Sequence, residues 1–148
     1  MNVTLQVFLM CAVVMDLSTG KISNRLICWA LISSIMLRIL GNEAGSVAMF
    51  FLNISIPVIV LYLLFQLRAL GAGDIKLFSV VGAYVFTYEL INIMSLAFLF
   101  GGVIGASKMA FRRVSADNYD GEIVCIHFSV AIWLAHMTHI LGVYIWKS

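Results

Sequence analysis

The sequence predicts an all-α, polytopic integral membrane protein with about six transmembrane helices. Two observations indicate this fold class. First, 63% of the 148 residues are hydrophobic and 11% are charged, with a mean hydropathy of +1.07, whereas soluble proteins are about 45–50% apolar and about 25% charged. Second, the apolar runs are continuous and do not alternate with polar residues, which favours helices over the strands of a membrane barrel. The length fits a single membrane-embedded domain, residues 1–148.

Polar breaks divide the chain into six apolar segments, about 2–19, 25–41, 46–67, 75–88, 89–110 and 123–146. The first segment lacks the Lys- and Arg-rich start of a signal peptide, so we interpret it as a retained span. The fourth segment is the shortest and falls below the roughly 20 residues that cross a bilayer. Its short length predicts that Asp74, which immediately precedes it, is recessed from the membrane surface.

Positive charges are distributed unequally between the two sides that six spans would define. Two of them, Arg38 and Lys147, fall on one side. The other side receives seven: Lys21, Arg25, Arg68, Lys76, Lys108, Arg112 and Arg113. Because cytoplasmic loops are enriched in Lys and Arg, the richer side is predicted to face the cytoplasm and both chain ends to lie outside it.

Two isolated aspartates stand at span edges on this richer side, Asp16 at the end of the first segment and Asp74 before the fourth. Ionisable groups at membrane depth are costly, rare and usually functional. Two neighbouring carboxyl groups share one proton, so one can take a proton from water while the other donates to a peptide carbonyl. The pattern indicates an aspartyl protease. The alternative is that both are interfacial residues solvated by loops and headgroups.

The surroundings of the two aspartates differ. Asp74 follows two glycines, Gly71 and Gly73, which would let an extended substrate strand approach closely. Asp74 opens a helix, whereas Asp16 lies one turn before Gly20, where the first helix should end. Because a helix dipole favours an anion at the N-terminus, we expect Asp16 to carry the shared proton more often.

Three segments resemble motifs of the type IV prepilin peptidases. Residues 71–77 (GAGDIKL) are similar to the GxGD-x-K signature of that family. Residues 16–24 (DLSTGKISN) resemble its first motif, an Asp followed by a basic residue, Ile, Pro and Asn. Residues 127–132 (HFSVAI) resemble a Pro-Tyr-Gly-Val-Ala-Ile stretch of its short members. Together with the six spans, the resemblance extends over essentially the whole chain.

The resemblance implies an aspartyl endopeptidase in the bacterial inner membrane, with its active site facing the cytoplasm. Such an enzyme removes the short, positively charged leader of prepilins by cutting after a Gly, just before the pilin's hydrophobic helix. Asp16 and Asp74 match the catalytic pair. The other matching positions are expected to support the site or orient the substrate: Lys21, Asn24, Gly71, Gly73 and Lys76.

Full-length members of that family also methylate the new N-terminus, using an added cytoplasmic region that often carries paired Cys-x-x-Cys motifs. The chain has no Cys-x-x-Cys, and its longest cytoplasmic loop, about 111–122, is too short for such a region. The resemblance therefore implies the peptidase-only form associated with Flp (tight-adherence) pili, with prepilins as partners and no cofactor. The chain departs from the motifs at Ser23, where Pro is usual, and at residues 127–129 (HFS), which replace Pro-Tyr-Gly.

Other functions are less well supported by the residues. His136 and His139 share a helix face, but His127 does not converge on them, so we expect no metal site. A net charge of +2 is too small to indicate nucleic-acid binding. The competing hypothesis is a non-enzymatic transporter or pilus or secretion assembly component, in which the aspartates form a proton relay. A relay would need polar residues through the outer halves of the spans, where we predict none.

Overall fold

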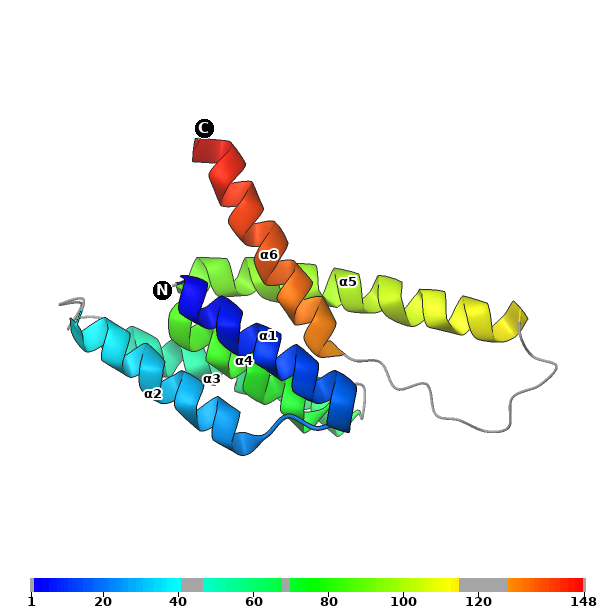
Figure 1. Cartoon of the computed structure of the whole chain (residues 1–148), viewed down its shortest axis with the longest axis horizontal. Helices are drawn as coiled ribbons and strands as arrows, with labels where there is room; N and C mark the ends of the chain where they lie inside the picture. Colours follow the sequence, from blue (N-terminus) through cyan, green and yellow to red (C-terminus); the bar gives the residue numbers. More distant parts are fainter. Residues whose placement is uncertain (1, 41–46, 68–69, 115–127, 148) are drawn as a thin grey trace.

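The computed structural model describes residues 2–40, 47–67, 70–114 and 128–147. Within these residues the chain forms six helices and no strand, as predicted (Figure 1). The helices are α1 (Asn2–Thr19), α2 (Asn24–Leu40), α3 (Val47–Gln66), α4 (Ala72–Tyr84), α5 (Thr87–Val114) and α6 (Phe128–Lys147). The boundaries of α4 and α5 differ most from the prediction, because both helices begin before their apolar segments, α4 ends sooner and α5 ends later. The predicted start of the sixth segment, residue 123, lies outside the described residues.

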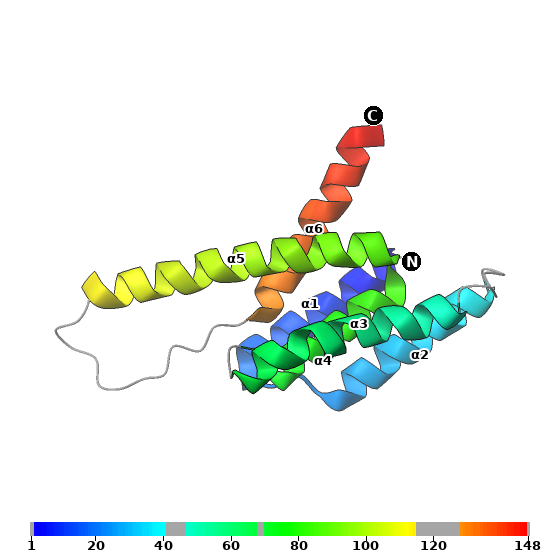
Figure 2. The ribbon, with the colours of Figure 1, turned by 180° about the vertical axis from the view of Figure 1, so that it is seen from behind.

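Successive helices run in opposite directions, so the connections alternate between two ends of the bundle (Figures 1 and 2). The change of direction between α1 and α2 follows from the residues that end one helix and begin the next. Gly20 adopts a left-handed φ of 64°, and its N–H donates to the Asp16 carbonyl at 2.9 Å, which ends α1 as glycine commonly ends helices. Ser23 then caps α2, because its Oγ accepts the Arg25 N–H at 3.3 Å. The end of α1, the starts of α2 and α4, and the start of α6 consequently share one end of the bundle.

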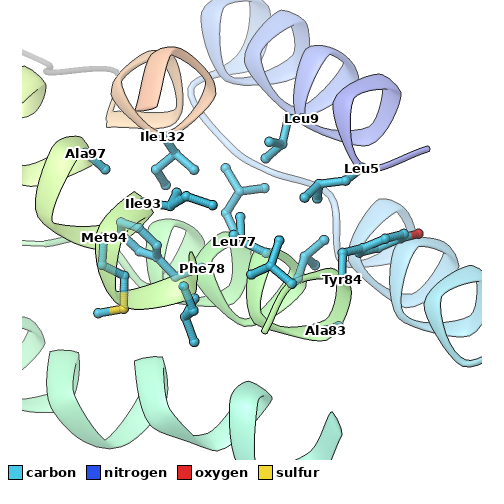
Figure 3. Packing of buried hydrophobic residues seen from close by; sticks show 14 of the residues in the cluster. Leu5, Leu9, Leu77, Phe78, Ala83, Tyr84, Ile93, Met94, Ala97 and Ile132 are labelled. Carbon is cyan, nitrogen blue, oxygen red and sulfur yellow. The ribbon is translucent and has the colours of Figure 1, made fainter. Parts of the chain in front are cut away.

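Helix α4 is the centre of the bundle and contacts each of the other five helices. It lies between α1 on one side and α3 on the other, as the two opposite views show (Figures 1 and 2). Leu5 and Leu9 of α1 and Ile132 of α6 point toward Leu77 and Phe78 of α4 (Figure 3). Because lipid tails are as apolar as these side chains, close packing rather than water exclusion holds the helices together.

The junction between α4 and α5 is buried, and side chains of α2 and α3 satisfy its backbone. The Ala83 carbonyl accepts hydrogen bonds from Ser34 Oγ at 2.5 Å and from Arg38 Nε and Nη2 at 3.1 and 3.0 Å. Asn53 Nδ2 donates to the Val85 carbonyl at 3.0 Å. Arg38, one of the two positive charges counted on the poorer side, is buried, and its guanidinium bonds to the end of α4.

The outer surface of the bundle is strongly apolar. On α3, Ile59 is 73% exposed and Leu63 is 69% exposed, and such a surface is stable when it faces lipid tails. Among the described residues, Met49–Gln66 and Thr87–Ser107 are long and apolar enough to cross a membrane, and Val3–Thr19 and Phe128–Val143 are shorter apolar helices. Helix α4 is shielded from this surface by its neighbours, which allows it to be short.

Candidate active site

Asp16 lies four residues before Gly20, on the last turn of α1, and is half-buried. Its position follows from the helix end described above, where the Gly20 N–H bonds to the Asp16 carbonyl. Its carboxylate Oδ2 accepts a hydrogen bond of 2.5 Å from Ser129 Oγ, at the start of α6. The side chain is thus anchored to α6, a helix 113 residues away in sequence.

Asp74 lies in the first turn of α4, three residues after the N-cap Gly71. The two residues bond reciprocally: the Asp74 N–H donates to the Gly71 carbonyl at 3.2 Å, and Asp74 Oδ2 accepts the Gly71 N–H at 3.3 Å. A Cβ on Gly71 would lie 3.1 Å from Asp74 Oδ2, closer than ordinary contact. Glycine at this position therefore leaves room for the Asp74 carboxylate.

The carboxyl groups of Asp16 and Asp74 lie near enough to interact through their charges. Asp74 sits on the loop side of the apolar segment that begins at Ile75, outside the predicted span. Burial raises the pKa of Asp74 to about 6, the hydrogen bond from the Gly71 N–H opposes the rise, and the charge of Asp16 adds to it. The two aspartates thus form a coupled pair at one end of the bundle, on helices that are in contact.

The structure also bears on which aspartate carries the shared proton. Both acids occupy the helix ends expected from the sequence. Ser129 is bonded to Asp16, and Asp74 is the member whose pKa is raised, mainly by burial. The expectation that Asp16 carries the proton rests on the helix dipole alone and stays a prediction.

The remaining motif residues surround the pair. Lys76 Nζ donates to Asn24 Oδ1 at 2.9 Å, which joins the starts of α4 and α2. A Cβ on Gly73 would lie 3.6 Å from Ile22, an ordinary contact, so this glycine packs beside the loop that follows α1. Lys21 lies in the same loop with an exposed side chain. The structure therefore brings both motifs together, with Lys21 outermost.

Ser129 is the residue whose contribution our sequence reasoning missed. We had noted it only as a departure from a motif, although it is fully buried and touches Asp16. The available signal was a polar residue at the start of an apolar helix, at the end of the bundle that holds both aspartates. His127, the first residue of that stretch, lies outside the described residues.

The other end of the bundle is more polar than we expected. Arg38 is buried there, and His136 Nδ1 lies 2.7 Å from Gln6 Oε1. Between this end and Asp74, however, most buried residues of α4 are apolar, among them Leu77 and Val81. The buried Ser79 donates to the Ile75 carbonyl at 3.1 Å, a bond within its own helix that does not connect the two ends as a proton relay would require.

Comparison with known proteins identifies one relationship. A model described as the type IV leader peptidase family matches residues 3–106, which include both aspartates and the residues around them. Ser129 and the rest of α6 lie beyond the matched part. No curated protein and no solved structure matches the chain.

Proposed function

Because this chain belongs to the type IV leader peptidase family, whose members are aspartic peptidases that cleave the leader peptides of prepilins, we propose that Asp16 and Asp74 are its catalytic pair. The observation that carries the proposal is the placement of these two carboxyl groups at one end of the bundle, on helices α1 and α4, which are in contact. Both are partly buried and both lie next to the exposed loops from which a water-soluble leader could approach.

The chemistry follows from one proton shared by two carboxyl groups. The ionised carboxylate takes a proton from a water molecule, whose oxygen attacks the scissile carbonyl carbon. The protonated carboxyl donates to the carbonyl oxygen as negative charge develops there. Gly71, beside Asp74, is exposed and has no side chain, which leaves room for an extended substrate segment to approach.

We further propose that the substrate is a Flp-type prepilin and that the site faces the cytoplasm. The excess of Lys and Arg at this end supports the orientation. The short connections support a peptidase without a methyltransferase region, since residues 115–127, between α5 and α6, are too few to form a separate domain.

The catalytic proposal is tested by co-expressing the protein with Flp-type prepilins of the same genome and measuring leader removal by mass spectrometry. We expect cleavage by the wild type and none by Asp16→Asn or Asp74→Asn, which keep the side-chain shape and lose the charge. Glu89→Gln is the matched control, because Glu89 caps α5 at the opposite end, where its Oε2 accepts the Phe86 N–H at 3.3 Å. Cleavage by either Asn variant, or by none of the proteins with any prepilin, would contradict the proposal.

The orientation requires a separate measurement. We expect a Lys21→Cys variant, made in a chain without its three native cysteines, to react with a membrane-impermeant thiol reagent only after the cells are permeabilised. Reaction in intact spheroplasts would place the site on the other side of the membrane and leave the catalytic proposal standing.

A further inference from the structure

Ser129 makes a short hydrogen bond to a carboxylate at the candidate active site. Its side chain is fully buried, and its Oγ lies 2.5 Å from Asp16 Oδ2. A distance of about 2.5–2.7 Å is typical of a hydroxyl that donates to an ionised carboxylate, and such bonds are roughly twice as strong as neutral ones. The hydroxyl therefore stabilises the charged form of Asp16 more than the protonated form.

Packing of Phe128 at the start of α6 holds the Ser129 hydroxyl in place. Phe128 packs against Phe78 of α4 and Phe98 of α5, with ring centroids 6.1 and 5.6 Å apart. Its ring also lies against the buried Gly101 of α5, where any Cβ would collide with it. An aromatic side chain enclosed on these sides fixes the first turn of α6, so Ser129 is held beside α1.

Asp74 has a different set of contacts. Its Oδ2 accepts a backbone N–H at 3.3 Å, a longer bond than the one that Ser129 makes to Asp16. Burial and the neighbouring charge both favour its protonated form. The two carboxyl groups are therefore unequal before any substrate binds.

We propose that Ser129 is a positioning residue that holds Asp16 ionised, which makes Asp16 the general base and Asp74 the general acid. This inference rests on the proposed function and assigns roles within the same pair. The serine lies outside the part of the chain that matches the family, and the similar stretch of short family members has Gly at this position, so the assignment comes from this chain's own geometry.

The assignment gives a balanced reaction. Asp16 takes a proton from water as the water oxygen bonds to the scissile carbon, and the carbonyl oxygen takes the proton of Asp74. The C–N bond then breaks as Asp16 returns its proton to the leaving nitrogen. Asp74 recovers a proton from one hydroxyl of the tetrahedral intermediate, which becomes the new carboxylic acid. Both aspartates finish as they began, and one water is consumed.

The charged and titratable groups of the helices packed against α1 have contacts of their own. Asp74 interacts with Asp16 through its charge. Lys76 bonds to Asn24, and Arg38 and His136 lie at the opposite end of the bundle. The other charged or titratable residues of these helices whose side chains the structure describes are Arg25, Cys28, Tyr84 and His139, and Tyr84 is bonded to the Ala30 carbonyl and to Ser33.

The test is the pH profile of leader removal by the purified full-length protein. The probe is a synthetic peptide that contains the leader and the first residues of a co-encoded Flp-type prepilin. Loss of a hydrogen bond to a charged group, about 1.5–3 kcal/mol, corresponds to about one to two pH units. We expect Ser129→Ala to move the acidic limb of the kcat profile up by about this amount, and Ser129→Thr, which restores the hydroxyl, to return it toward the wild-type position.

Ser79→Ala is the matched control, because Ser79 is a buried serine whose Oγ donates to Ile75 of its own helix at 3.1 Å. We expect it to leave the profile unchanged. If Ser129→Ala does not fold, Ser129→Gly provides the same loss of the hydroxyl and should give the same displacement. An acidic limb that stays in place in a folded Ala or Gly variant overturns the inference. The Asp16→Asn and Asp74→Asn variants decide the proposed function separately.

Discussion

Replacing Gly82 with Ala tests the central position of α4 in the bundle. A Cβ at Gly82 would collide with the backbone carbonyl oxygen of Asn53 in α3 and would lie 3.3 Å from Leu90 Cδ2. A backbone oxygen cannot rotate away as a side chain can. The variant must therefore separate α3 from α4, the most extensively packed pair of helices in the described structure.

The expected magnitude follows from two opposing effects. Ala is favoured over Gly in a helix interior by about 1 kcal/mol, whereas overpacking a well-packed contact costs about 1–3 kcal/mol. Separation of α3 from α4 also weakens the bond of Asn53 to the Val85 carbonyl, which contributes about 1 kcal/mol. We expect Gly82→Ala to lower the free energy of unfolding by about 1–3 kcal/mol.

The assay is equilibrium unfolding by SDS in mixed micelles, followed by the fluorescence of the three Trp residues. Gly102→Ala is the matched control, because Gly102 is also helical but a Cβ there would have no neighbour within 4 Å. We expect this control to be neutral or up to about 1 kcal/mol more stable. Equal stability of the two variants would refute the close contact between α3 and α4.

Three further experiments probe other contacts. Asn53→Leu leaves two polar groups at the α4–α5 junction without a partner and should lower the free energy of unfolding by about 1–3 kcal/mol in the same assay. A double-mutant cycle of Lys76→Met and Asn24→Ala, measured on cleavage, should give a coupling energy of about 0.5–1 kcal/mol, because the Lys76–Asn24 hydrogen bond is exposed. Additive effects of the two substitutions would mean that this hydrogen bond contributes nothing to cleavage. Gly101→Ala should displace the Phe128 ring and slow cleavage, whereas unchanged kinetics would show that the start of α6 tolerates the shift.

Local signals in the sequence were sufficient to predict the helices and the placement of both aspartates. Gly20 ends α1 one turn after Asp16, and glycine in a left-handed conformation is a reliable end signal because other residues are strained there. Asp74 stands just before the fourth apolar segment, which indicated that it opens a helix, and α4 indeed begins at Ala72. Six alternating helices then bring both acids to one end.

Contacts between helices distant in sequence were not predictable from such signals. Arg38 was counted only as a positive charge on one side of the membrane, and nothing local in the sequence indicates that it bonds to the Ala83 carbonyl. Ser129 reaches Asp16 across 113 residues. A single sequence records which residues are polar but not which polar groups meet, because that depends on how the helices pack.

The short length of α4 constrains the order in which the protein can be built. Its 13 residues rise about 20 Å, less than the roughly 30 Å of a hydrocarbon core. Alone in lipid, it would leave the carbonyls at its C-terminal end without hydrogen-bond donors, at a cost of several kcal/mol each. The donors come from α2 and α3, so α4 is stable only once those helices are already in the membrane. Asp74, carried on α4, therefore reaches Asp16 only after α2 and α3 are in place, so the proposed catalytic pair forms late in assembly.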